Sequence, residues 1–188
     1  MLSFSHTLPL CFSSQLPKWR ILEFRHHYPV AVVQLYPRLS PGMTVQRVGL
    51  DPLVPSYLGL GANKHKMEYV ASGSENIPFP DAHFDIVACL NALDHVDDLD
   101  ATIREIKRVT KPGGFFLLSV EIDHPPTPTE PITLNDVVLK TFGPEFEVLS
   151  EFRVGTPCDH NLHRAVMTRL PAYVNGQPGI YVARYLRR

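Results

Sequence analysis

Residues that could bind a ligand or move a proton follow closely after the apolar segments of this chain. Asp51 comes directly after RVGL, His95 lies shortly after FDIVACL, and His124 follows GGFFLLSVEID. A carboxylate such as Asp51 can accept two hydrogen bonds from a pair of hydroxyl groups. An imidazole changes charge near neutral pH, so His124 and His95 are candidates for a general base. These residue types favour proton-transfer chemistry beside a polar binding site.

Each of these residues also has a purely structural interpretation, in which it neither binds a ligand nor moves a proton. His124 lies in HPPTP and can be an ordinary loop residue, whereas His95 can pack against a following helix. Asp51 precedes Pro52, and Asp-Pro pairs are common in turns. The adjacent histidines His26 and His27 have no third ligand at a useful spacing, so we expect no metal site.

Seven short apolar segments are the elements that must position these residues. They are rich in β-branched and aromatic residues, and turn-rich or helix-period segments separate the first five of them, a pattern typical of a mostly parallel sheet flanked by helices. FDIVACL and GGFFLLSV are apolar on both faces, which indicates interior strands. The last two segments carry interspersed polar residues and are expected to form the outer part of the sheet. The predicted strands are residues 19–24, 45–50, 67–71, 84–90, 115–122, 146–154 and 180–186.

The clearest helix is predicted over residues 99–109, where apolar residues recur at steps of four, three and three and charged residues take the opposite face. Pro112-Gly113-Gly114 is expected to end this helix. A shorter helix is predicted to begin at Pro29, with Pro37 limiting it to about two turns. Residues 123–131, DHPPTPTEP, are predicted to form a stiff loop at the carboxyl end of a strand.

Composition places the chain among ordinary globular proteins. Its 188 residues are enough for one domain with a real core; 44% are apolar and 20% charged, and the net charge is -1. These values exclude a disordered tail, a polybasic nucleic-acid binder and a membrane span of usual length. Three unclustered cysteines argue against a disulfide framework, so we expect a cytoplasmic protein. Cys89 lies inside an apolar run and is interpreted as a small buried hydrophobic residue.

Three stretches of the chain, in order, resemble the class I S-adenosylmethionine-dependent methyltransferases. They are VGLDP at residues 48–52, SENIPFPDAHFDIVACLNALDHVDD at 74–98 and IREIKRVTKPGGFFLL at 103–118. The resemblance implies a Rossmann-like, doubly wound α/β fold with a mostly parallel sheet and an antiparallel edge strand. It predicts an N-terminal arm over residues 1–17 and one methyltransferase-like domain over residues 18–188.

The resemblance also implies which residues hold S-adenosylmethionine. Glu23 and Asp51 end the first two strands, and the Asp51 carboxylate could accept both ribose hydroxyls. The loop after the third strand would lie along the edge of the adenine; the alternative is an ordinary loop without a binding role. The residues after the fourth strand would face the methyl donor. The cofactor-binding residues predicted in this way are Glu23, Asp51, Pro52, Gly73, Ser74, Asn91 and Ala92.

The sequence lacks the glycine-rich turn of the family, which has the pattern [DE]-x-G-x-G-x-G. Alignment of Glu23 with the acidic position puts Arg25, His27 and Pro29 at the glycine positions. Each residue forced into a left-handed conformation costs about 1 to 2 kcal/mol, and a few kcal/mol in all weaken binding by about a hundredfold to ten-thousandfold. Three explanations stay open: a turn of another shape, loss of donor binding with retention of the fold, or a damaged segment at residues 25–29.

Two functions of different classes follow. The first is methyl transfer from S-adenosylmethionine to a small-molecule acceptor, since the chain has no basic stripe for nucleic acid and no added recognition domain. His124 and His95 are the predicted catalytic residues in that case. The second is a degenerate, non-catalytic methyltransferase fold that binds a partner, which the missing glycines motivate. A nicotinamide dinucleotide enzyme is the weakest alternative, because it needs its own glycine fingerprint after the first strand.

Overall fold

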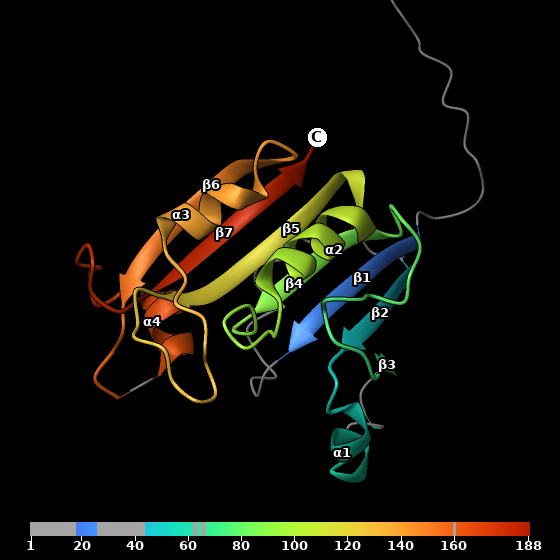
Figure 1. Ribbon diagram of the computed structural model, residues 1–188, viewed down its shortest axis with the longest axis horizontal. Helices are drawn as coiled ribbons and strands as arrows, with labels where there is room; N and C mark the ends of the chain where they lie inside the picture. Colours follow the sequence, from blue (N-terminus) through green and yellow to red (C-terminus); the bar gives the residue numbers. More distant parts are fainter. Residues whose placement is uncertain (1–17, 26–43, 62–63, 65–66, 160) are drawn as a thin grey trace, which may run out of the picture.

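A computed structural model describes residues 18–25, 44–61, 64, 67–159 and 161–188 of the chain. Over these residues the chain forms one seven-stranded sheet in the order β3-β2-β1-β4-β5-β7-β6 (Figure 1). The predicted arm over residues 1–17 and the helix expected from Pro29 lie outside the described residues. The strands are β1 (Lys18–Arg25), β2 (Thr44–Leu50), β3 (Glu68–Val70), β4 (Phe84–Leu90), β5 (Thr110–Ile122), β6 (Phe146–Gly155) and β7 (Gly179–Arg187), so all seven predicted strands are present.

The strand directions confirm the predicted Rossmann-like, doubly wound α/β fold. β1 pairs in parallel with β2 on one side and with β4 on the other, and β4 pairs in parallel with β5. β7 is the antiparallel strand of the outer part of the sheet, where it lies between β5 and β6. The strand order reverses between β1 and β4, and open sheets of this kind bind ligands outside the carboxyl ends of the strands at such a reversal.

Five short helical elements accompany the sheet in the described part of the chain, and one of them was predicted. The helix α2 begins at Leu99, where it was expected, and its buried face comprises Ile103, Ile106 and Val109. Its first turn is capped by Asp98, whose carboxylate accepts a hydrogen bond from the backbone N–H of Ala101 at 2.9 Å. The elements are α1 (Val54–Gly59), α2 (Leu99–Val109), α3 (Asp136–Leu139), a 3₁₀ turn (Lys140–Phe142) and α4 (Leu162–Thr168).

The Pro-Gly-Gly turn does not end α2, contrary to the sequence prediction. The helix already ends at Val109, and Thr110 has an extended backbone as the first residue of β5. The glycines instead form an irregularity in β5, whose register with β4 shifts in this region. A Cβ atom at Gly114 would lie 2.8 Å from the Lys111 carbonyl oxygen and 2.9 Å from that of Asp85. The glycine is therefore needed because two backbone segments approach each other closely.

α2 and α3 cover one face of the sheet (Figure 1), and α4 packs against β6 and β7. Alternate residues of β7 point to opposite faces of the sheet and pack in different clusters. Tyr181 and Tyr185 belong to the large core that includes residues of α2 and α3, whereas Ile180 and Val182 pack with Ala165 of α4. β4 is buried along nearly all of its length, which confirms that FDIVACL is an interior strand.

The family-like stretches at residues 74–98 and 103–118 are joined by one arginine. Arg108 of α2 donates hydrogen bonds to the carbonyl oxygens of Ile77 (2.9 Å) and Phe79 (2.8 Å). It also pairs with Asp81 at 2.8 Å and with Glu105 at 2.7 Å. Glu105 in turn accepts a hydrogen bond from the backbone N–H of Ile77 at 2.8 Å. These contacts give the IPFPD segment a structural role, which is to fix the loop that leads into β4.

Phe142 lies at the centre of an aromatic cluster in the large core. It is fully buried, and its ring centroid lies 4.9 Å from that of Phe116 and 5.6 Å from that of Tyr185. We expect Phe142→Ala to lower the free energy of unfolding by about 3 to 5 kcal/mol, because it removes buried apolar contacts and leaves a cavity. Urea denaturation measures the change. Leu170→Ala, at a 63% exposed position, is the control and should differ little from the parent.

Glu105 is expected to make the fold sensitive to acid. The Arg108 guanidinium bonded to it lowers the pKa of Glu105 from its ordinary value of 4.5. Its contribution to stability is therefore complete above about pH 4.5 and is lost as the pH falls through the lower pKa of the folded state. Glu105→Gln should cost about 1.5 kcal/mol at neutral pH and flatten the decline in stability below pH 4.5.

Urea denaturation at several pH values tests this effect of Glu105. The control is Glu147→Gln, whose carboxylate forms an exposed pair with Arg188 at 3.3 Å, since exposed pairs contribute little. An unchanged slope of stability against pH in Glu105→Gln would contradict the assignment.

Candidate active site

A cavity of about 570 Å³ lies at the carboxyl ends of β1 to β5. Its volume is within the range of small-molecule pockets, and its place at the reversal of strand order is the one that the fold favours. Its walls come from the ends of β1 and β2, from the loops after β2, β3 and β4, and from one residue of the loop after β5. The described lining residues are Phe24, Leu50, Asp51, Pro52, Leu53, Ser72, Gly73, Ser74, Glu75, Ala92, His95, Val96, Asp97 and Thr129.

Asp51 stands on the cavity wall directly after β2. Its Oδ1 accepts a hydrogen bond from the backbone N–H of Leu53 at 2.7 Å, which agrees with the turn interpretation. Asp51 also lines the cavity, and its role in binding stays a prediction. Burial and the nearby Asp51 carboxylate raise the pKa of Tyr57 on α1. The predicted residue Pro52 also lines the cavity.

The loop after β3 forms the next part of the wall, as predicted for Gly73 and Ser74. A Cβ atom at Gly73 would lie 2.4 Å from Oε2 of Glu75, so a larger residue would push this carboxylate aside. The Ser74 hydroxyl lies 2.9 Å from that of Thr102 on α2. Glu75 Oε1 accepts a hydrogen bond from the backbone N–H of Asp97 at 2.9 Å. The loops after β3 and β4 are thereby held together around the cavity.

Glu23 and Asn91, two of the predicted binding residues, are not among the described residues that line the cavity. Glu23 is fully buried, and its Oε1 accepts hydrogen bonds from Nε and Nη2 of Arg47 at 3.1 and 2.8 Å. Asn91 has a left-handed backbone with φ of 50°, and its neighbour Ala92 does line the cavity. Glu23 lies near the carboxyl end of β1, and Asp51 directly follows the adjacent parallel strand β2, so both lie toward the same edge of the sheet.

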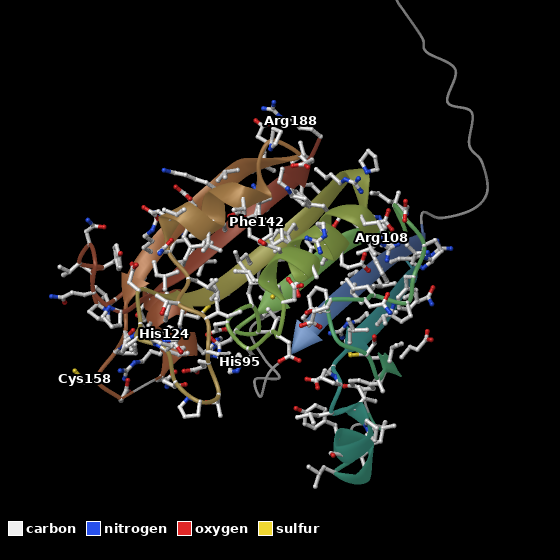
Figure 2. The ribbon with its side chains drawn as sticks, viewed as in Figure 1. His95, Arg108, His124, Phe142, Cys158 and Arg188 are labelled. Carbon is white, nitrogen blue, oxygen red and sulfur yellow. The ribbon has the colours of Figure 1, made fainter. Side chains whose placement is uncertain are left out.

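The two predicted catalytic histidines, which Figure 2 labels, both lie within 4 Å of one buried carboxylate. Asp94 is fully buried; His95 Nε2 lies 3.8 Å from its Oδ1, and His124 Nε2 lies 3.5 Å from its Oδ2. Burial raises the pKa of Asp94, and the two neighbouring histidines oppose this shift. His95 lines the cavity, whereas His124 lies behind Asp94 and does not appear on the described wall. Their place in catalysis stays a prediction.

The loop after β5 contributes more to the site than its sequence indicated. Residues 123–131 lack helix and strand, as predicted, yet Thr129 lines the cavity and Glu130 reaches to 4.0 Å from His95 Nε2. Sequence reasoning missed both residues because, apart from His124, it interpreted this segment as a stiff loop. The available signal was its place at a strand end together with its threonine and glutamate side chains. Asp123, at the start of the loop, accepts a hydrogen bond from the Tyr173 hydroxyl at 2.6 Å.

Cys89 is 2% exposed, and burial raises the pKa of its thiol. This environment agrees with a small hydrophobic role and opposes a nucleophilic one.

Comparison with known proteins agrees with the fold and the cavity. Residues 45–118 match the protein family described as a methyltransferase domain. This segment of the chain is similar to a methyltransferase domain. A relative, the ubiquinone/menaquinone biosynthesis C-methyltransferase UbiE of Shewanella frigidimarina, is 44% identical over 54 residues. That match covers 29% of this chain and 22% of the relative, so the chain is aligned with about a fifth of the relative's length.

Solved structures with the same fold are much more distant in sequence. The [4+2]-cyclase SpnF has a TM-score of 0.61 at 17% identity, over 93% of this chain and 76% of that one. The N-methyltransferase NodS from Bradyrhizobium japonicum, solved with S-adenosyl-L-homocysteine, has a TM-score of 0.58 at 12% identity, over 90% and 78%. A cyclase and a methyltransferase thus share this fold, so the fold alone does not determine the reaction.

None of the helices in the described part of the chain has the length and apolar character needed to cross a membrane.

Proposed function

We propose that this protein is a methyltransferase that transfers the methyl group of S-adenosylmethionine to a small-molecule acceptor. The observation that carries this proposal is the cavity at the reversal of strand order, with Asp51 on its wall directly after β2. The family match and the C-methyltransferase relatives support it.

The charge of the cavity wall suits a sulfonium donor. Asp51, Glu75 and Asp97 place three carboxyl groups on the wall, and no lysine or arginine occurs among the described lining residues. A pocket lined by one sign of charge attracts a ligand of the opposite sign. The cavity volume and these acidic groups therefore fit a positively charged nucleoside.

We assign the wall as follows. Asp51 with Pro52 would hold the ribose, because a carboxylate can accept hydrogen bonds from both hydroxyls. The Gly73–Ser74 loop would lie along the edge of the adenine, and Ala92 and Asn91 would lie beside the methyl-bearing end of the donor. When bound, the donor supplies a methyl group on a good leaving group, so the protein has mainly to align the two reactants.

A small-molecule acceptor agrees with the chain's net charge of -1 and with the acidic cavity. A nucleic-acid acceptor would require a basic surface for the phosphates. The relatives named as C-methyltransferases of quinone biosynthesis also act on small molecules by their names.

A second candidate is a non-catalytic protein that retains the methyltransferase fold. The Arg47–Glu23 pair favours it, because the acidic residue that ends β1 is buried against an arginine. The replaced glycines at positions 25, 27 and 29 point the same way. This protein would keep the scaffold and bind a partner.

Calorimetric titration of the full chain with S-adenosylmethionine separates these candidates. Saturable micromolar binding is the expected result for the enzyme. Asp51→Ala should weaken binding by about tenfold to a hundredfold, since hydrogen bonds to a charged group are worth about 1.5 to 3 kcal/mol. Asp100→Ala, an exposed acidic residue of α2, is the matched control and should bind as the parent does.

No heat at millimolar donor would overturn the enzyme proposal and favour the non-catalytic one. Equal donor affinities for the parent and Asp51→Ala would remove Asp51 from the ribose site.

A further inference from the structure

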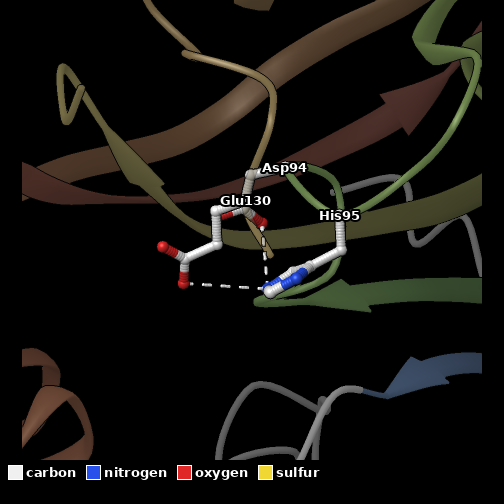
Figure 3. Close-up of side chains that lie close together, drawn as sticks. All are labelled: Asp94, His95 and Glu130. Atoms are coloured by element: carbon white, nitrogen blue, oxygen red, sulfur yellow. Dashed lines mark ion pairs between the residues drawn. The ribbon is translucent and has the colours of Figure 1, made fainter. Parts of the chain in front are cut away.

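Three side chains with metal-ligating atoms converge beside the cavity, outside the residues assigned to the donor. One carboxylate oxygen of Asp94, Nε2 of His95 and one carboxylate oxygen of Glu130 all lie within 4.8 Å of one another (Figure 3). The His95 Nε2 atom is 3.8 Å from Asp94 Oδ1 and 4.0 Å from Glu130 Oε1. Two loops that follow different strands, β4 and β5, therefore bring these atoms together.

The histidine presents a lone pair to this cluster when it is neutral. His95 Nδ1 lies 2.7 Å from the Thr129 carbonyl oxygen. A carbonyl oxygen only accepts hydrogen bonds, so Nδ1 carries the proton and Nε2 is the acceptor nitrogen of the neutral ring. A backbone carbonyl on the far ring nitrogen is the usual outer contact of a metal-ligating histidine, because it fixes the tautomer and the ring orientation.

Asp94 gives an independent observation. Its side chain is fully buried, and neither carboxylate oxygen has a hydrogen-bond partner among the described residues. His124 Nε2, 3.5 Å from Oδ2, belongs to a ring whose Nδ1 lies 2.9 Å from the Pro125 carbonyl oxygen, so the neutral His124 ring also turns an acceptor toward Asp94. A buried carboxylate facing acceptors is costly unless a proton or a metal cation lies between them.

We propose that Asp94, His95 and Glu130 bind a divalent first-row transition-metal ion of the Zn²⁺ type. Imidazole and carboxylate ligands suit such ions. Metal–ligand bonds of about 2.0 to 2.2 Å put tetrahedral ligand atoms about 3.4 Å apart, so the 3.8 and 4.0 Å separations need only a small contraction. His124, on the other oxygen of Asp94, is the outer neighbour of the site.

The site has an entry path and an open position. His95 and Thr129 both line the cavity, so an ion bound at His95 Nε2 lies next to the space where a small molecule would bind. Three protein ligands with one open position are typical of zinc sites that polarise a bound oxygen. The site does not depend on methyl transfer, and it departs from the expectation, based on His26 and His27, that the chain holds no metal.

Zinc titration of the full chain, stripped of metal with a chelator, tests the proposal. We expect saturable binding of one Zn²⁺ per chain in calorimetry and, with Co²⁺, the visible absorption of a low-coordinate site. His95→Gln and Glu130→Gln should each weaken Zn²⁺ binding by roughly a hundredfold or more, because loss even of an outer partner costs about 10- to 100-fold. His163→Gln, an exposed histidine of α4, is the matched control and should bind as the parent does.

Asp94→Asn tests the buried ligand, with circular dichroism to verify its fold. Should it fail to fold, His95→Gln and Glu130→Gln carry the test, because neither side chain is fully buried. Absence of saturable binding in the parent, or equal Zn²⁺ affinity in the parent, His95→Gln and Glu130→Gln, would overturn the proposal. Donor binding is measured separately with S-adenosylmethionine, so failure of one proposal leaves the other testable.

Discussion

The parallel pairing of β1 with both β2 and β4 is the constraint on which the rest of the structure depends. It forces the carboxyl ends of neighbouring strands to one edge of the sheet, and the reversal of strand order leaves a space there that none of the described helices fills. Asp51, Ser74 and His95 come from different strands and are distant in sequence. They share one cavity because each lies just beyond a strand of this set.

The loops that surround this edge are fixed by hydrogen bonds between charged side chains and backbone groups. Arg108 and Glu105 hold the segment before β4, while Glu75 ties the loop after β3 to the backbone at Asp97. Hydrogen bonds between a charged side chain and backbone groups are strong, so they can fix a loop that buries little apolar surface. The residues most characteristic of the family are therefore divided between scaffold and cavity, and IPFPD belongs to the scaffold.

Two features give this site a character that the family resemblance does not imply. The acidic residue at the end of β1 is bonded to Arg47, so the Glu23 carboxylate already has a cationic partner. The loop after β5 folds back over the loop after β4, where the backbone N–H of Ile132 bonds to the Asp94 carbonyl oxygen at 3.4 Å. That contact places Glu130 beside His95 and makes the cluster of Asp94, His95 and Glu130 part of the cavity rim.

The sequence by itself determined the fold class, all seven strands, the start of α2 and the acidic residue after β2, because apolar periodicity and turn residues are local signals. It could not determine that α2 ends before the glycines. Gly114 is needed because its backbone lies close to that of Asp85, which is 29 residues away in the sequence. Only the tertiary structure decided that Glu23 meets Arg47 and that His95, His124 and Glu130 gather at Asp94. Those contacts join residues far apart in the chain, and their geometry depends on how the loops pack, which no local pattern encodes.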